Sequence, residues 1–585
     1  MQLIDLAVDT FENTLLAVDA INGVLMTFKI FLTLALSLFI TEKTLASASI
    51  KKNTLVTALN FELDTLNPLV YNSVAAAFVL DASNRYLIAL DSSGKPTPIL
   101  IKEVPSLKNH NLSFFPTKEG RGLKIDIEFL PQAAWGDGAP LTCEDLKLSW
   151  EIGSNPNVSV PSRDMFTDIT DVKINPSNAK KCSIFFKKAA WSYYLNMPRM
   201  IAAHLERPIY EKYKNEPQAY ERNSLYVREP TLAGLYNGAY RVAEYKLGEY
   251  VRLLPNEHFY GKAPFFKAVT IKFILNSSAM EANLLSGALD MVSSSGFTLD
   301  QALAFEKRIE KDHLAYKVNI KPSMTFSFID CNLDNPILKD IHVRKALSYM
   351  ISREEIINSF YEGKLTPAYS FANPIDTYYT LDAKNLQLYK RDKTKATQLL
   401  EQAGWQMRAD GYRYTDNKKL SLTLTATADL KIIETIEVFI KNNWKSIGVD
   451  LQIKNYPGRV LFSDIVPKRK FDLAFYSMSG SSDDDHRTMF HSSFIPSEKN
   501  SFSGQNYSGW NNSNVDKWLD QEQVEFDPQK RKPLMLKIMK AYNDELPSLP
   551  VYFKSVNSVT PTELKGYEMS PHLYSEFLHI EDWSL

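Results

Sequence analysis

The sequence predicts an α/β protein built as two lobes. Two stretches far apart in the chain, 269–292 and 420–476, each alternate strand-like and helix-like patterns. A strand, a helix and a second strand of this length predict a parallel crossover, with the helix covering one face of a sheet. The chain has 585 residues, more than one ordinary hydrophobic core accommodates. We therefore expect two α/β lobes, with a ligand bound in the groove between them.

The first unit begins with a strand predicted over Val269–Leu275, where apolar and polar residues alternate with a period of two. Residues Ser277–Leu289 follow with apolar side chains every three to four positions, which predicts a helix that buries one face. The alternation in the strand predicts that only one of its faces is buried.

The second unit shows the same order of elements. Leu420–Thr425 alternates like a strand, and Ile432–Ile447 has helical spacing. Gly448 is expected to end that helix, because glycine adopts the left-handed backbone conformation common just after a helix. Val449–Ile453 is the next predicted strand.

Composition excludes several classes of function. The chain has 67 Lys and Arg against 68 Asp and Glu, a net charge of -1, so it lacks the basic excess of a general nucleic-acid binder. Cys143, Cys182 and Cys331 are widely spaced and too few for a disulfide framework or a four-thiolate zinc site. At most one disulfide bridge is possible, and the sequence does not decide whether it forms.

The N-terminal region carries an export signal. Ile30–Ile40 is an apolar run directly after Lys29, the right length for the core of a secretory signal peptide and short for a membrane span. Small residues at 46–48 offer a cleavage site, so 1–48 is the predicted signal region. The acidic first 25 residues fit a signal badly, and we expect translation to start at Met26. An uncleaved anchor or a buried helix is the alternative reading.

A short stretch, Trp135–Ser149, combines several local signals. Asp137-Gly138 is a turn dipeptide, Thr142 is a predicted helix N-cap, and Glu144 and Asp145 place negative charge in the first helical turn. The stretch closely resembles the signature of the extracellular solute-binding proteins of family 5. These are the periplasmic binding components of peptide and nickel ABC importers.

Other blocks resemble the same family in the same order along the chain. One departure is Ser352, which stands where the family usually has Asp. Any single block is weak evidence, but the ordered set is specific. The blocks are Thr57–Pro68, Asn237–Gly261, Leu284–Met291, Asp340–Ile357, Lys395–Trp405 and Pro547–Tyr552.

The resemblance implies a periplasmic binding protein fold of type II, similar to cluster C, with the ligand cleft between the lobes. It implies lobe I over 49–318, lobe II over 319–546, and a return to lobe I over 547–585. The chain would cross between lobes near Ile320 and Leu546, and these crossings would form the hinge. The resemblance also implies a monomer that delivers its solute to an inner-membrane ABC permease, without a cofactor. No cysteine follows the predicted cleavage site, so a lipoprotein is not expected.

The most informative ligand-binding segment is Phe471–His491. Its first eight residues alternate like a buried strand, and the next residues therefore emerge at the strand end, where open α/β sheets present ligands. In peptide-binding members of the family, the loop at this place carries a Trp and, after it, an Asp that pairs with the ligand's α-amino group. Here Met478 stands in the Trp position and Ser481 falls at the Asp by direct count. Asp483 lies two residues later and takes the role if the loop is longer.

Two other interpretations of this loop stay open. It can be a solvated acidic turn in which Asp484 or Asp485 caps the next helix. A metal site made of Asp483, Asp485, His486 and His491 is chemically conceivable but not favoured. We do not predict a metal.

The remaining candidates for ligand binding are residues on strand ends and loops near the expected cleft. Arg459 could bind a carboxylate with two hydrogen bonds, and the aromatic residues could cover side chains of varied shape. Each of them could equally be an ordinary packing or surface residue. They are Tyr71, Asn72, Arg459, Tyr476, Met478, Ser479, Asp484, Tyr507 and Trp510.

The predicted function is the capture of oligopeptides or dipeptides in the periplasm for import. The alternative is the same fold with another solute, such as an oligosaccharide, an opine-like conjugate or a nickel chelate. A secreted hydrolase is a third hypothesis, but short sequence motifs of hydrolases, zinc proteases and nucleotide-binding enzymes are missing. We therefore do not expect an enzyme.

Overall fold

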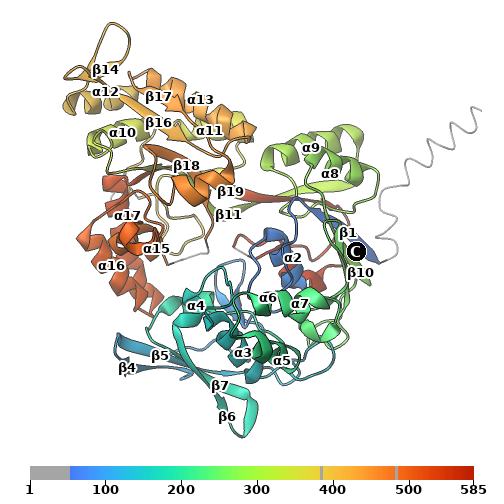
Figure 1. Cartoon of the computed structure of the whole chain (residues 1–585). Coiled ribbons are helices and arrows are strands. Elements are labelled where there is room, and N and C mark those ends of the chain that lie inside the picture. The colour runs from blue at the N-terminus through green and yellow to red at the C-terminus, as the bar shows by residue number, and fades with distance from the viewer. Residues whose placement is uncertain (1–52, 383–385, 481–484, 573) are drawn as a thin grey trace, which may run out of the picture.

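The computed structural model describes residues 53–382, 386–480, 485–572 and 574–585. The predicted signal region and Met26 lie outside these residues, as do Asp483 and Asp484. Figure 1 shows two bodies, joined by a pair of long strands. We call the lower body, which contains the N-terminal half of the described chain, lobe I, and the upper body lobe II. Within the described residues, no helix has the length and apolar character needed to cross a membrane.

Lobe I contains two four-stranded sheets and a short ribbon. In the first sheet the order is β1 (Thr54–Leu59), β10 (Ala268–Phe273), β9 (Tyr250–Pro255) and β8 (Tyr240–Lys246). The second sheet has the order β4 (Leu112–Thr117), β5 (Gly120–Glu128), β7 (Asn178–Phe186) and β6 (Ile169–Asn175). The ribbon pairs β2 (Ile88–Leu90) with β3 (Pro96–Pro98).

Helices cover these sheets and close the lobe I core. The α-helices are α2 (Val74–Ser83), α3 (Cys143–Ser154), α4 (Asp164–Thr167), α5 (Ala203–Tyr213), α6 (Ala219–Asn223), α7 (Leu225–Arg228), α8 (Ser277–Leu285) and α9 (Leu299–Asp312). Short helical turns are η2 (Trp191–Asn196), η3 (Ala233–Leu235) and, near the C-terminus, η7 (Glu576–Asp582). A disulfide joins Cys143 at the start of α3 to Cys182 on β7, which settles the bridge that the sequence left open.

Lobe II is built on one six-stranded sheet. Its order is β12 (Thr366–Pro367), β19 (Ser548–Pro561), β11 (Tyr316–Cys331), β18 (Leu473–Met478), β16 (Ser421–Thr425) and β17 (Asp450–Ile453). Strand β16 pairs in parallel with both β17 and β18, as the second strand–helix–strand unit predicts. A separate small sheet consists of β13 (Gln406–Met407), β14 (Arg413–Thr415) and β15 (Lys418–Lys419).

The lobe II sheet has a hydrophobic core on each face. One core packs against α10 (Ile341–Tyr349), α11 (Arg353–Tyr361), α12 (Lys393–Gln402) and α13 (Lys431–Lys445). The other packs against α16 (Ser513–Gln523) and α17 (Pro528–Glu545). Shorter elements are α14 (Gly458–Val460), η4 (Leu461–Ile465), α15 (Arg487–Phe490), η5 (Ser492–Phe494) and η6 (Glu498–Asn500).

Strands β11 and β19 connect the lobes. They pair antiparallel from Tyr316 opposite Pro561 to Asp330 opposite Ser548 (Figure 1). The side chains of 549–553 pack in the lobe II cores, whereas Val559 packs in a lobe I core. We therefore propose that the return crossing lies near Asn557, which pairs with Ile320, and not at Leu546. Antiparallel pairing puts the two crossings side by side, as a hinge requires.

The local sequence signals agree well with the elements found. Thr142 caps α3 in a capping box with Asp145, and Gly448 follows α13 with a φ of +86°. The helix predicted over Ser277–Leu289 is shorter than expected, because α8 ends at Leu285 and Gly287 adopts a φ of +74°. Glycine at this position therefore turns the chain before the last predicted turn of helix can form.

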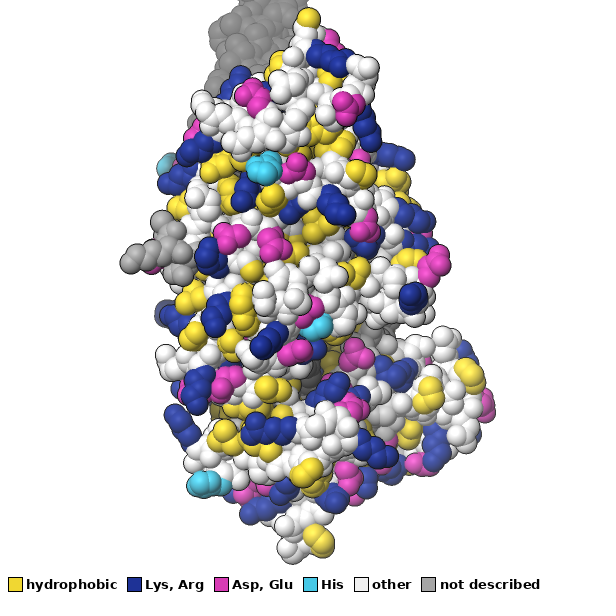
Figure 2. All heavy atoms as spheres, turned by 90° about the vertical axis from the view of Figure 1, so that its left-hand side faces the viewer, with side chains coloured by type: hydrophobic (Ala, Val, Ile, Leu, Met, Phe, Trp, Pro, Cys, Tyr) yellow, Lys and Arg dark blue, Asp and Glu magenta, His cyan; other side chains and the backbone are white. Residues whose placement is uncertain are grey.

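Figure 2 shows the side of the molecule that lies on the left of Figure 1. Basic and acidic side chains are interspersed over this face, and neither sign forms a large continuous area. This pattern agrees with the nearly neutral composition of the chain. It lacks the basic stripe by which a nucleic-acid-binding face is recognised.

Candidate functional site

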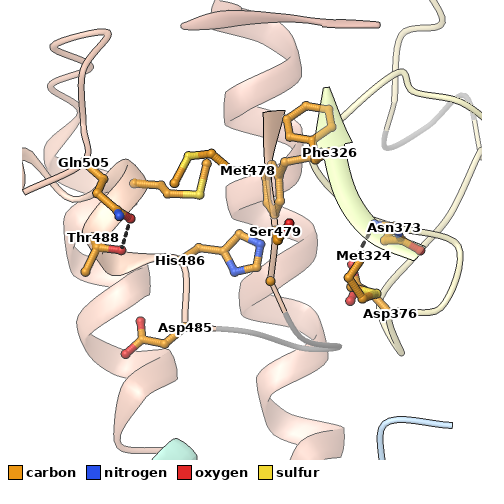
Figure 3. A pocket seen from close by; sticks show the side chains of 13 residues that line it. Met324, Phe326, Asn373, Asp376, Met478, Ser479, Asp485, His486, Thr488 and Gln505 are labelled. Atoms are coloured by element: carbon orange, nitrogen blue, oxygen red, sulfur yellow. Dashed lines mark hydrogen bonds between the residues drawn. The ribbon is translucent and has the colours of Figure 1, made fainter. Parts of the chain in front are cut away.

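A pocket lies in lobe II where β18 ends. Met478, the last residue of the strand, and Ser479, which follows it, both line the pocket (Figure 3). The Ser479 hydroxyl lies 3.0 Å from that of Thr325 on β11, so the two neighbouring strands are tied together at the pocket. The faint blue and teal ribbons at the lower edge of Figure 3 have the colours of lobe I.

One wall of this pocket is apolar and deformable. It is formed by Met324, Phe326, Phe371, Met478 and Met489. Methionine side chains are unbranched and polarisable, so they adapt to ligands of different shape. The wall therefore suits an apolar side chain without demanding one particular shape.

The rest of the pocket lining is polar. Asn373, Asp376, Asp485 and His486 line it together with Ser479. Asp376 is only 6% exposed, and its carboxylate accepts a hydrogen bond of 2.6 Å from the backbone N–H of Asn373. Figure 3 shows Asp376 and Asp485 on opposite sides of His486, so each is a separate candidate partner for a ligand ammonium group.

Asp485 also has a local structural role. Its carboxylate accepts a hydrogen bond of 3.0 Å from the backbone N–H of Arg487 in the first turn of α15. Asp485 stands one position before the N-cap residue His486, so this hydrogen bond stabilises the turn that leads into α15 and is not a helix cap. Asp483 and Asp484 lie outside the described residues, and the ammonium-binding role of Asp483 stays a prediction.

A second, larger pocket lies in lobe I. Tyr71 and Asn72, both predicted, line it, and so do Tyr86, Tyr194 and Tyr574. It encloses about 460 Å³, against about 100 Å³ in the lobe II pocket. Another part of its wall comes from α4 and the residues just before it, namely Pro161, Ser162, Met165 and Phe166. Figure 1 shows α4 on the surface of lobe I that is turned toward lobe II.

The lobe I pocket has a buried cation in its wall. Arg199 is 3% exposed and forms a salt bridge with Asp81, while its Nη1 donates a hydrogen bond of 2.7 Å to the Asn84 carbonyl. Burial lowers the pKa of Arg199, but the neighbouring Tyr86, Tyr71 and Asp81 raise it by a larger amount. The pKa therefore lies above its usual value, and the guanidinium stays charged. Its Nε is buried and has no hydrogen-bond partner within the described residues.

Four predicted residues lie away from both pockets. Tyr476 is 8% exposed and donates to Asp330 in the lobe II core, and Trp510 is 2% exposed with its Nε1 donating to Glu545. Tyr507 packs at the edge of the same core, and its backbone carbonyl accepts from Arg469. Arg459 is exposed at the start of α14.

Sequence reasoning missed the residues that come from distant segments. Asp376, Tyr86, Tyr194 and Arg199 carry no local pattern that separates them from structural residues. Among the pocket residues that were not predicted to bind ligand, Asp485 and His486 did carry a usable signal, because they follow the strand that ends in the pocket. The described residues contain no group of three or more His, Cys, Asp or Glu side chains arranged to hold a metal ion.

Comparisons with known proteins identify the family of the chain. The family model "Bacterial extracellular solute-binding proteins, family 5 Middle" matches residues 119–501. The oligopeptide-binding protein AppA of Bacillus subtilis is 23% identical over 468 residues, which cover 79% of this chain and 81% of AppA.

Solved structures show the same fold. An oligopeptide-binding protein from Thermus thermophilus, complexed with a pentapeptide, superposes with a TM-score of 0.71 at 21% identity and covers 92% of this chain and 96% of its own. NikZ from Campylobacter jejuni, in complex with Ni(L-His), has a TM-score of 0.69 at 24% identity and covers 91% of this chain and 100% of its own. The two-lobed α/β fold predicted from the sequence is confirmed. The chain belongs to the bacterial extracellular solute-binding proteins of family 5.

Proposed function

We propose that this protein captures oligopeptides between its lobes and delivers them to an ABC permease in the membrane. The observation that carries the proposal is the pairing of two pockets, one on each lobe, on bodies joined by the strands β11 and β19. A solute that contacts both lobes binds the closed arrangement better than the open one and thereby shifts the equilibrium toward closure.

The chemistry of the pockets supports a peptide. The lobe II pocket offers Asp376 and Asp485 to an α-ammonium group and a methionine-lined wall to an apolar side chain. The lobe I pocket offers tyrosine rings, which suit apolar and aromatic side chains of varied shape. AppA and the Thermus thermophilus protein, by their names, bind oligopeptides.

The proposal includes export through a cleaved signal over 1–48 and action as a monomer outside the cytoplasm. The Cys143–Cys182 disulfide supports an oxidising compartment, since structural disulfides persist there and are rare in a reducing cytosol. Cys331 is buried and free, so it offers no surface thiol. We further propose that the bound solute is carried unaltered, without catalysis.

A non-peptide solute is the second candidate, and two observations favour it. Met478 replaces the aromatic residue expected beside the peptide ammonium, and NikZ, of the same fold, holds a nickel–histidine complex. Opine-like conjugates and oligosaccharides remain in this class.

Native mass spectrometry of the purified protein tests the proposal by identifying solute that co-purifies. Calorimetric titration then compares a set of defined tri- to pentapeptides with Ni(L-His) and with maltotriose. Binding of free-amine peptides with 1:1 stoichiometry is expected, and mass spectrometry of the recovered peptide should show no cleavage. Binding of the nickel chelate with no peptide binding would replace the peptide by the second candidate. Cleavage of the peptide would contradict both.

A further inference from the structure

The two lobes touch each other at a place far from the hinge strands. Phe526, in the connection between α16 and α17, packs edge-on against Phe114 of β4, with ring centroids 5.1 Å apart. Arg531, in the first turns of α17, lies with its guanidinium carbon 3.8 Å from the ring centroid of Trp191 in η2. The face drawn in Figure 2 is the side of α16, α17 and β4.

Both members of the Arg531–Trp191 pair are largely removed from water. Arg531 is 9% exposed and Trp191 is 3% exposed. Cation–π attraction is strongest where the cation has lost its hydration, so this pair is in a favourable setting. The ring contact of Phe526 with Phe114 adds apolar burial beside it.

Contacts within lobe II fix the orientation of the Arg531 guanidinium. Arg531 Nη1 donates a hydrogen bond of 3.3 Å to the Glu525 carbonyl, and its Nε lies 3.6 Å from the Glu522 carboxylate. These contacts occupy the edge of the guanidinium and leave its flat face for the indole. Little conformational freedom then remains to be lost when the lobes meet.

The contact is continuous with both pockets. The Trp191 ring lies 6.1 Å from the ring of Tyr194, which lines the lobe I pocket. On the other side, Arg531 and Tyr378 line one small hollow, and the Tyr378 hydroxyl lies 3.5 Å from Nε2 of His486 in the lobe II pocket. The contact between the lobes therefore lies next to residues that neighbour both pockets.

We propose that the contact of Phe526 and Arg531 in lobe II with Phe114 and Trp191 in lobe I stabilises the closed arrangement, so that this arrangement is populated before any solute binds. We call this contact the latch. The proposal rests on the proposed function only in that the closed arrangement is the one that holds solute. A protein with a populated closed state binds more tightly in proportion to that population, and its solute dissociates more slowly.

The test measures the distance between the lobes in the full-length mature protein without solute. Spin labels are attached to Ser177→Cys in lobe I and Lys418→Cys in lobe II. Double electron–electron resonance spectroscopy then measures the distribution of distances between the two labels. Both positions are exposed, and the native cysteines are bridged or buried, so they escape labelling. The variants are Phe526→Ala and Arg531→Gln, with Lys530→Ala as the control, because it removes a charge from an exposed neighbour of Arg531.

The solute-free wild type and Lys530→Ala should contain the short, closed distance. In Phe526→Ala and Arg531→Gln the ratio of closed to open molecules should fall at least about fivefold, and the Kd for a probe tripeptide, Ala-Phe-Ala, should rise in inverse proportion to the measured closed fraction. Identical solute-free distributions in all four proteins would overturn the latch. If neither the wild type nor any variant binds peptides, the proposed function is contradicted. A difference between the solute-free distance distributions of the wild type and the latch variants would still support the latch in that case. Circular dichroism melting curves identify a variant that has lost its fold.

Discussion

The hydroxyl of Tyr476 donates a hydrogen bond to the carboxylate of Asp330 inside the lobe II core. Both side chains are buried, on the adjacent strands β18 and β11. Burial raises the pKa of Asp330 to about 7, although the Tyr476 hydrogen bond and the Arg469 charge lower it in part. An acid in this state is protonated in the folded protein over a pH range in which the unfolded chain has lost the proton.

This shift predicts that Asp330 makes the free energy of unfolding fall as the pH rises from about 4 to about 7. In that range the folded state holds a proton that the unfolded state lacks, so each added pH unit favours unfolding by up to about 1.4 kcal/mol. Above the folded-state pKa the contribution of Asp330 is constant. Urea denaturation at several pH values, followed by fluorescence, measures the slope.

Asp330→Asn is the matched control, because an amide keeps the hydrogen-bond acceptor for Tyr476 and does not titrate. The free energy of unfolding of Asp330→Asn minus that of wild type should increase between pH 4.5 and 7 and then level off. Parallel pH profiles for the two proteins would show that Asp330 does not titrate in this range.

The same strand shows how far sequence patterns reach. The alternation in Phe471–Met478 correctly predicts a strand that ends at the pocket. It cannot tell where along the strand the core ends and the pocket begins, because Tyr476 and Met478 are two residues apart and lie on the same face of the strand. Tyr476 therefore looked like a pocket residue, whereas it lies in the core, and Met478 and Ser479 line the pocket.

Local backbone signals were the most reliable part of the prediction. The Thr142 cap and the Gly448 helix end depend only on neighbouring residues, and both were predicted. The parallel pairing of β1 with β10 joins residues more than 200 positions apart, and no local pattern encodes it. The Arg199 contact with Tyr86 and the pocket position of Asp376 depend on the same long-range packing.

Arg353 is predicted to be essential for the stability of lobe II. It is 1% exposed, and its guanidinium donates to the backbone carbonyls of Ala368, Tyr389 and Pro550. Arg353→Met leaves these buried acceptors without donors and should lower the free energy of unfolding by roughly 3–5 kcal/mol. Urea denaturation measures the loss. Lys345→Met, on α10, should change stability by no more than about 0.5 kcal/mol; an equal loss in both would refute the role of Arg353.

The Cys143–Cys182 bridge is predicted to stabilise lobe I. It closes a loop with a sequence separation of 39 residues, so removing it restores freedom to the unfolded chain. The double variant Cys143→Ala, Cys182→Ala should be less stable by about 2–4 kcal/mol and should no longer respond to reductant. Cys331→Ala should keep the full response to reductant, because Cys331 is not in the bridge. A wild-type protein whose denaturation curve ignores reductant would contradict the bridge.

Tyr71 is predicted to contact the solute from lobe I. Its ring lies in the pocket wall, 5.8 Å from the guanidinium carbon of Arg199. Tyr71→Ala should weaken peptide binding by about 1–2 kcal/mol, through lost apolar and aromatic contact, and Tyr71→Phe should weaken it less. Calorimetric titration measures both. Tyr414→Ala, on the separate three-stranded sheet of lobe II, should leave the affinity unchanged.

Asp483 is predicted to bind the ammonium group of a peptide from the loop that follows the lobe II pocket residues Ser479 and Gly480. A charged partner removed from a closed cleft leaves the other charge unpaired, so Asp483→Ala should weaken binding of a free-amine peptide by about 2–5 kcal/mol. The N-acetylated form of the same peptide carries no ammonium, so wild type and Asp483→Ala should bind it equally. If the variant loses the same affinity for both peptides, Asp483 does not act on the ammonium. If it loses none, Asp376 and Asp485, which line the described pocket, are the carboxylates that remain to bind it.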